Sequence, residues 1–351
     1  MKIDLHTHIL PPRWPDLSER YGYAGFVHLK PCGAGRAQLM RGGRLFREID
    51  SNCWDPQRRL AECDQAGVDL QVLSTVPVMF SYWAKPADAA DLSRLLNDHI
   101  AQVIADHPGR FAGLGTIPMQ DAELAVRELE RCVAPASRGG LELAGVQIGT
   151  HVDANEFQGR PARNLNDPSV FPVFERAAQL GAAVFVHPWD MLGADRMPQY
   201  WLPWLVGMPA ETSLAICSLI FGGVLERLPA LRVAFAHGGG AFPFTAGRVE
   251  HAFRVRPDLT AIDNPTAPSR YLRQADGTPA RFWVDSLTHD ARSLRLLLEV
   301  LGPERVCLGS DYPFPLGEPR PGALIESLAE LPAATRELLL SGAASEFLNT
   351  C

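Results

Sequence analysis

The sequence has little lysine, no CxxC spacing and no long apolar run. Only Lys2, Lys30 and Lys85 occur among 351 residues, against 30 arginines, and the formal net charge is −7. An acidic chain without a basic block is poorly suited to bind nucleic acid or an anionic membrane surface. The seven cysteines are an odd number, which favours free thiols in a reducing cytoplasm over a disulfide framework.

Several motifs that would define other protein classes are also missing. No stretch reaches 18 uninterrupted apolar residues, so we expect no membrane span. Charge and histidine interrupt the first residues, Met1–His6, so we expect no signal peptide there. The absence of GxGxxG, GxxxxGK[ST] and GxSxG argues against dinucleotide, P-loop and serine-hydrolase chemistry.

Short apolar runs that end in small or polar residues recur along the whole chain. We predict that they are buried parallel strands over Lys2–His6, Leu70–Thr75, Phe111–Thr116, Gly145–Gly149, Ala182–His187, Arg232–His237, Arg281–Asp285 and Arg305–Asp311. Between them lie helical patterns at Pro56–Ala66, Leu92–Val103, Leu124–Cys132, Pro209–Leu228 and Leu294–Leu301. Eight strand–helix units predict an α/β fold, a closed (β/α)8 barrel.

We expect residues 1–351 to form a single barrel domain. The segment between the first strand and the helix at Pro56 exceeds normal loop length, and its glycine, proline and aromatic content predicts a small insertion or lid at about residues 12–55. The polar stretch Thr150–Asp167 is interpreted as a surface loop.

Histidines and one aspartate stand at the ends of four predicted strands. His6 and His8 project from the same face of the first strand, because residues two apart in an extended segment share a face. His187, His237 and Asp311 end three further strands, and barrel active sites lie at that face. A single such histidine is usually a core residue, but four strand ends together predict a catalytic metal site.

Imidazoles with one carboxylate favour zinc, with manganese, cobalt and iron as alternatives. All three lysines lie too early in the chain to supply the carboxylated lysine that bridges binuclear sites in barrels, so a mononuclear site is favoured.

His237 is followed by Gly238–Gly240, which lets backbone or substrate approach closely. His237 is a candidate general base on water or a more distant metal ligand. Arg47 and Arg248 are candidates for binding substrate carboxylates, although among 30 arginines a solvated surface position is the commoner case for each. His151 and Asp285 follow strand ends and either orient a ligand or have structural roles.

Longer strings carry a family resemblance. The start MKIDLHTHILP, HPWDM at 187–191, YWLPWLVGMPAET at 200–212, AHGGGAFPF at 236–244 and GSDYPFPLGE at 309–318 resemble the amidohydrolase superfamily, and within it decarboxylases of unsaturated amino-dicarboxylate semialdehydes. The resemblance implies one zinc with a bound water. Its implied ligands are His6, His8, His187 and Asp311.

The resemblance also implies roles for residues around the metal. It implies that His237 activates the water and that Asp311 helps to handle protons. It implies that Arg47 binds one substrate carboxylate and that Arg248 binds another from the neighbouring subunit of a homodimer. Matches to pocket-lining positions are Arg41, Met191, Trp201, Phe314 and Leu316.

The implied reaction is non-oxidative decarboxylation of 2-amino-3-carboxymuconate 6-semialdehyde to 2-aminomuconate 6-semialdehyde and CO2. Its setting would be the kynurenine branch of tryptophan catabolism or bacterial nitroaromatic degradation, in the cytoplasm. Metal hydroxide also attacks carbonyl groups, so a hydrolase or hydratase of an unsaturated carboxylate is the alternative. A non-enzymatic binding protein would show gaps in the metal set, and none is visible.

Overall fold

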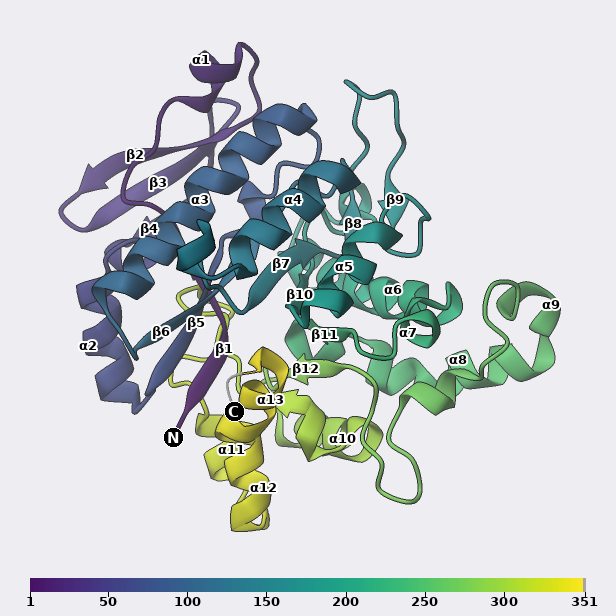
Figure 1. The fold of residues 1–351 in the computed structure, drawn as a ribbon. Helices are drawn as coiled ribbons and strands as arrows, with labels where there is room; N and C mark the ends of the chain where they lie inside the picture. Colours follow the sequence, from purple (N-terminus) through teal and green to yellow (C-terminus); the bar gives the residue numbers. More distant parts are fainter. Residues whose placement is uncertain (350–351) are drawn as a thin grey trace.

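The eight predicted strands form one parallel sheet that curls into a barrel in the computed structural model, which describes residues 1–349 (Figure 1). In spatial and chain order they are β1 (Ile3–Ile9), β5 (Leu70–Thr75), β6 (Phe111–Thr116), β7 (Gly145–Gly149), β10 (Ala183–His187), β11 (Arg232–Phe235), β12 (Trp283–Asp285) and β13 (Val306–Cys307). Backbone hydrogen bonds join the two edges: Leu5 N–H donates to Leu308 O at 2.9 Å and Asp311 N–H to His6 O at 2.8 Å. The predicted (β/α)8 barrel is confirmed.

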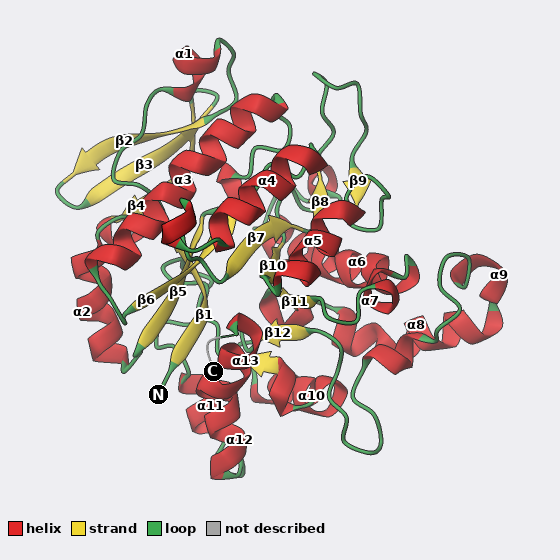
Figure 2. Ribbon diagram, in the orientation of Figure 1, coloured by secondary structure: helices red, strands yellow, loops and turns green. Residues whose placement is uncertain are grey.

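Helices surround these strands, as Figure 2 shows. The longer helices are α2 (Pro56–Ala66), α3 (Pro86–Asp106), α4 (Ala122–Val133), α5 (Phe171–Leu180), α6 (Met208–Phe221), α8 (Phe242–Val255) and α10 (Ala291–Leu301). Shorter helices are α1 (Leu17–Tyr21), α7 (Val224–Arg227), α9 (Pro257–Thr260), α11 (Ala323–Ser327), α12 (Ala333–Glu337) and α13 (Ala343–Leu348). The core lies between the helices and the strands and also fills the inside of the barrel.

Capping residues explain where helix α2 begins and ends. The Asp55 carboxylate accepts the N–H groups of Gln57 and Arg58, and Pro56 occupies the first turn, where its missing N–H costs nothing. Gly67 ends the helix at φ 69°, a left-handed conformation that suits glycine. The predicted bounds of this helix are therefore confirmed.

Several predicted boundaries are wrong. Strand β1 continues through Ile9 because polar Thr7 and His8 still pair with β5. Regular pairing of β13 stops at Cys307, and the following backbone bends, so that Asp311 adopts φ 57°. The single helix predicted over Pro209–Leu228 is broken after Phe221, because Gly223 adopts φ 67°.

The predicted insertion after β1 contains an antiparallel sheet. Its strands are β2 (Val27–Gly33), β3 (Arg36–Arg41) and β4 (Arg44–Asp50), in that order. Buried Leu10, Phe26, Leu39 and Ile49 belong to one apolar cluster with residues of α3, which attaches the sheet to the barrel (Figure 1). Movement of this sheet as a lid, and the single-domain organisation, stay predictions.

The stretch Thr150–Asp167 is more than a surface loop. It contains a two-stranded ladder of β8 (His151–Val152) and β9 (Arg163–Asn164). Asn155 within it is fully buried and donates to the carbonyl oxygens of Tyr82 and Ala84 at 2.9 and 2.7 Å. The surface-loop prediction holds for the exposed and partly exposed residues of the stretch and is wrong for Asn155, whose side chain bonds to backbone inside the fold.

The helical segment Pro203–Phe221 is long and apolar enough by length and composition to cross a membrane. It is a core helix of the barrel, in which Ala215, Ile216, Leu219 and Ile220 are buried. Within residues 1–349 the cysteines are free thiols, as expected. Cys351, which is included in the same prediction, lies outside the described residues.

Candidate metal centre and substrate pocket

The predicted metal-binding side chains meet at the carboxyl end of the barrel. Strand β1 carries His6 and His8, β10 ends at His187, and Asp311 follows β13. The Nε2 atoms of His6 and His8 lie 3.1 Å apart, and Asp311 Oδ1 lies 3.5 Å from the first and 3.1 Å from the second. The ring of His187 is centred 4.9 Å from each of the other two rings. The structure thus brings all four predicted ligands together.

The outer nitrogen of each of these histidines is held by a fixed oxygen. His6 Nδ1 lies 2.7 Å from Asp285 Oδ2, His8 Nδ1 lies 3.1 Å from Thr75 O, and His187 Nδ1 lies 2.9 Å from Pro188 O. These acceptors place the ring proton on Nδ1 and turn the Nε2 lone pair toward the centre. Metal-ligating histidines typically have such an arrangement.

The donor set fits a divalent cation. Two Nε2 lone pairs and a carboxylate oxygen at these separations repel one another unless a positive charge lies between them. Ligand atoms at about 2.1 Å from one tetrahedral ion lie roughly 3.4 Å apart, close to the observed spacings. The buried His187 Nε2 has no hydrogen-bond partner within the described residues. These residues form a His/Asp metal site.

The pKa values of the proposed ligands shift in both directions. Burial opposes protonation of His6, but its bond to Asp285 and the charges of Asp311 and Asp285 outweigh burial and raise its pKa. Burial, with the neighbouring histidines, holds the pKa of His187 well below its usual value, and burial lowers that of His8. Burial opposes ionisation of Asp311, but the neighbouring histidines His237, His8 and His6 outweigh it and hold its pKa well below the ordinary value. Neutral imidazoles and an ionised carboxylate are the forms that bind metals.

His237 differs from the other three histidines. Its Nε2 lies 3.8 Å from Asp311 Oδ2, so it belongs to the same cluster. Its buried Nδ1, however, has no bonded oxygen among residues 1–349. It adopts φ 56°, an uncommon conformation for a residue other than glycine. His237 is thus the histidine of this cluster whose Nδ1 lacks an orienting oxygen among residues 1–349, and it lies within metal-binding distance of His6, His187 and Asp311.

Asp285, whose role the sequence leaves open, orients this part of the site. Its carboxylate accepts the N–H groups of His237 and Gly238, each at 2.8 Å, and also holds His6. The glycines after His237 permit close backbone packing, because a Cβ on Gly240 would lie 2.3 Å from Pro209 O. The GGG stretch therefore accommodates protein backbone.

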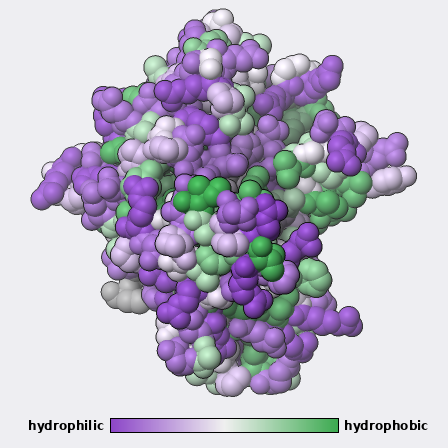
Figure 3. All heavy atoms as spheres, turned by 90° about the vertical axis from the view of Figure 1, so that its right-hand side faces the viewer, coloured by the Kyte–Doolittle hydropathy of each residue, from purple (hydrophilic) through white to green (hydrophobic). Residues whose placement is uncertain are grey.

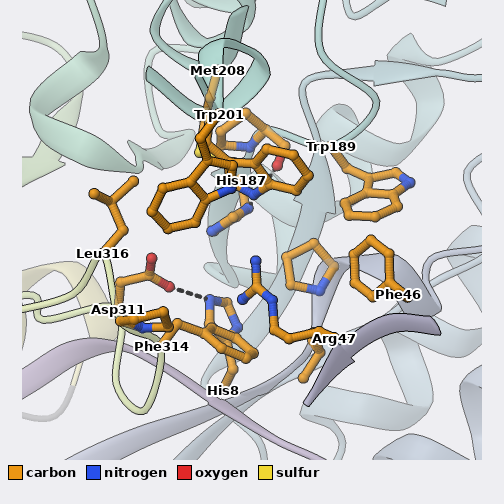
Figure 4. Close-up of a pocket in the computed structure, with 15 residues that line it drawn as sticks. His8, Phe46, Arg47, His187, Trp189, Trp201, Met208, Asp311, Phe314 and Leu316 are labelled. Atoms are coloured by element: carbon orange, nitrogen blue, oxygen red, sulfur yellow. Dashed lines mark hydrogen bonds and ion pairs between the residues drawn. The ribbon is translucent and has the colours of Figure 1, made fainter. Parts of the chain in front are cut away.

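A pocket opens over the metal site (Figure 4). Its walls are mostly aromatic and apolar, and Arg47 from strand β4 points into it. The Arg47 guanidinium carbon lies 4.6 Å from the centre of the Phe314 ring. Burial lowers the pKa of Arg47, and within residues 1–349 no carboxylate lies within ion-pair distance of it. A half-buried cation without a carboxylate partner is a ready site for an anion.

The predicted pocket residues divide into two groups. Arg47, Trp201, Phe314 and Leu316 line the pocket together with His8, His187 and Asp311. Arg41, at the end of β3, is exposed, and Met191 is buried beside the pocket; neither is among its lining residues. Arg248 is exposed on α8, away from this pocket.

Phe46 and Met208 also line the pocket and were not singled out as pocket residues from the sequence. The position of Phe46 next to the predicted residue Arg47 could have indicated that it lies near the pocket. Met208 lies within a string that carries the family resemblance, but an apolar side chain is equally typical of a pocket wall and of the hydrophobic core, so its residue type does not identify a pocket position.

Comparisons with known proteins agree with this architecture. A family model described as Amidohydrolase matches residues 3–350. The chain is 58% identical over 348 residues to the 2-amino-3-carboxymuconate-6-semialdehyde decarboxylase of Dictyostelium discoideum, covering 99% of this chain and 91% of that protein. It is 40% identical to the protein of that name in Caenorhabditis elegans, covering 97% and 92%. The solved apo structure of IDCase from Metarhizium anisopliae superposes with a TM-score of 0.80 at 22% identity, covering 99% and 97%.

The fold and the His/Asp centre define a metal-binding barrel enzyme. The chain belongs to the amidohydrolase family.

Proposed function

We propose that this protein is a metal-dependent decarboxylase that converts 2-amino-3-carboxymuconate 6-semialdehyde to 2-aminomuconate 6-semialdehyde and CO2. The relatives of that name, similar over nearly the whole chain, support the choice of substrate. The observation that carries the proposal is the partnerless Arg47 facing the His/Asp centre in an aromatic pocket. This arrangement suits a flat, conjugated, anionic substrate.

His6, His8, His187 and Asp311 would hold the metal, and zinc is the metal that we propose, with manganese, cobalt or iron as substitutes. When bound, a divalent metal acidifies coordinated water and polarises oxygen atoms. The second carboxylate oxygen of Asp311, Oδ2, faces His237 at 3.8 Å. Asp311 therefore connects the metal site to the proposed base.

Side chains of the pocket bind the substrate and transfer protons. Arg47 binds a substrate carboxylate through its guanidinium fork, while Phe314 and Trp201 pack against the conjugated plane. His237 accepts a proton from water and delivers one to the carbon that loses its carboxylate, and the hydroxide left behind regains a proton from solvent, so each turnover consumes one solvent proton. The C–C bond breaks, CO2 leaves, and a C–H bond forms, so no organic cofactor or oxidant is needed.

A homodimer would complete the site. The substrate carries two carboxylates, whereas Arg47 is the one arginine that lines the pocket in the described chain. Helices α8 and α9 project from the body (Figure 1), and Phe244 on α8 is 85% exposed, four residues before Arg248. Val255, Leu259 and Ile262 are also exposed there, and Figure 3 shows apolar residues on this side of the molecule. We propose that a second copy covers this face and that each subunit places its Arg248 in the pocket of the other. We also propose that the protein acts in the cytoplasm.

A hydrolase or hydratase would use the same centre, and the products separate the alternatives. The experiment incubates metal-loaded protein with freshly prepared substrate and measures CO2 release together with ultraviolet decay. The proposal expects one CO2 for each substrate consumed. Turnover without CO2 would overturn it in favour of water addition.

The His237→Ala variant tests the proposed base in the same assay. Loss of a general acid–base group typically costs about 10²- to 10⁴-fold in rate. We expect that loss with full metal content. Near-normal turnover would contradict the assigned role, and loss of metal would make His237 a ligand.

A further inference from the structure

Arg59 on helix α2 is a fully buried arginine without an acidic partner. Its side chain is 0% exposed, and no carboxylate within residues 1–349 lies in ion-pair distance of it. Burial lowers the pKa of its guanidinium. Burying an unpaired charge is unfavourable in free energy because the charge loses its hydration. A role in packing alone therefore does not explain an arginine at this position.

The guanidinium bonds to four neutral acceptors. Nη1 donates to His8 O at 2.7 Å and to Asn52 O at 3.0 Å. Nη2 donates to Thr7 Oγ1 at 3.1 Å, and Nε donates to Gln71 Oε1 at 3.2 Å. Its carbon lies 4.7 Å from the centre of the Tyr312 ring. One planar group thus touches four separate segments of the chain.

Three of these four segments contain residues of the proposed site or are adjacent to them in the chain. Thr7 and His8 belong to the metal-binding strand β1, and Tyr312 follows the ligand Asp311. Asn52 lies in the turn Ser51–Cys53, which begins immediately after strand β4, the strand that carries Arg47. The bond from Leu10 N–H to Cys53 O, at 2.8 Å, joins the same turn to the end of the metal strand.

We propose that Arg59 is a positioning residue that holds the Arg47 strand in register with the metal ligands His8 and Asp311. It sets the geometry of the metal centre and the distance from that centre to the bound carboxylate. The second of these effects rests on the proposed function; the first concerns the metal site alone.

The chemistry of arginine fits this role and that of lysine does not. A guanidinium presents donors in fixed directions within one plane and can stack on an aromatic face. A lysine at this position keeps the charge but reaches fewer of the four acceptors. A methionine keeps the length and leaves all four without their donor.

The test uses full-length Arg59→Met and Arg59→Lys proteins. Co²⁺ alone serves as the probe: its visible spectrum reports ligand geometry, and competition with a coloured chelator gives its dissociation constant. KM and kcat are measured separately on protein loaded with Co²⁺. The control is Arg110→Met, because Arg110 also ties α2 to a neighbouring segment, through Asp64 at 2.7 Å and Asp69 O at 3.2 Å, without contacting a ligand-bearing segment.

We expect Arg59→Met to bind Co²⁺ about 10- to 100-fold more weakly, with an altered spectrum, as occurs when groups that orient metal ligands are lost. Arg59→Lys should lie between this variant and the wild type, and both should raise KM. Arg110→Met should leave the spectrum unchanged. A folded Arg59 variant with wild-type Co²⁺ affinity and spectrum would overturn the proposal.

If Arg59→Met does not fold, Arg59→Lys carries the test with the same criteria. Loss of the fold in both variants would assign Arg59 to stability alone and overturn the positioning role. The spectrum and affinity need no substrate, so they remain decisive even if the wild type fails to release CO2; that failure would overturn the proposed function only.

Discussion

The Nε2 atoms of His6 and His8 lie 3.1 Å apart, while the Nδ1 atom of each ring is held by an oxygen on its outer side. Neither nitrogen of the facing pair is set up to donate to the other. A cation between them turns this repulsion into coordination, with Asp311 close to both rings. The arrangement explains why two histidines on one strand face are fully buried at the mouth of a barrel.

Asp285→Asn should weaken metal binding by about 10- to 100-fold, because the carboxylate that orients His6 is lost. The amide also cannot accept the N–H groups of His237 and Gly238 with both of its ends. Titration with a chelator measures the change. Asp290→Asn, which alters only the exposed cap of α10, is the control. Equal metal affinity in the two variants would count against the orienting role of Asp285.

Arg47→Met should lower kcat/KM by about 10- to 100-fold, because a hydrogen bond to a charged group contributes roughly 1.5–3 kcal/mol. The variant should keep its metal, since Arg47 lies within hydrogen-bond distance of none of the four ligands in the described structure. Steady-state kinetics and metal analysis provide the measurement. Arg44→Met, an exposed position on the same strand, is the matched control. If both variants lose the same activity, Arg47 does not bind the substrate.

His151 should make stability depend on pH. Burial opposes its protonation, but hydrogen bonds to Asp153 and Glu211 outweigh burial and raise its pKa to about 10, from 6.5 in the unfolded chain. Its contribution is therefore complete below pH 6.5 and is lost as pH rises through about 10.

Across that window the wild type should lose up to about 1.4 kcal/mol of unfolding free energy for each pH unit relative to His151→Gln. Urea unfolding of both proteins at several pH values measures the difference. A difference that stays constant with pH would show that His151 is not protonated in the folded protein.

Arg248→Ala should impair turnover if the arginine crosses to a neighbouring subunit. Mixing it with inactive His187→Ala should recover activity, because a hybrid dimer contains one site with both native residues. Recovery is measured after subunit exchange has been demonstrated with labelled protein. No recovery despite exchange would contradict a shared site.

The strand ends of the barrel could be predicted from the sequence because each buried run is short, apolar and closed by a polar residue. Alternation along β1 placed His6 and His8 on one face, and the structure confirms their proximity. The bounds of β5, β6 and β7 agree with the predicted runs because both faces of these strands are buried, apart from isolated partly exposed positions.

Other features depend on contacts between distant segments, which local patterns do not reveal. The burial of Asn155 requires the carbonyl groups of Tyr82 and Ala84, more than 70 positions earlier in the chain. Arg59 looks like any surface arginine of an amphipathic helix until β1 and the turn at Asn52 close around it. The small sheet β2–β3–β4 is predicted only as an insertion, although apolar and polar residues alternate over residues 27–30 and 36–39, which is the available signal for its first two strands.

The most direct measurement combines metal analysis with the decay of fresh 2-amino-3-carboxymuconate 6-semialdehyde before and after chelation. The account predicts about one divalent metal per chain, decay with CO2 release faster than the spontaneous reaction, loss of that activity on chelation and its return with Zn²⁺. Metal at hundredfold excess over its dissociation constant should also add about 2.7 kcal/mol to stability. Full activity in metal-free protein would contradict the account.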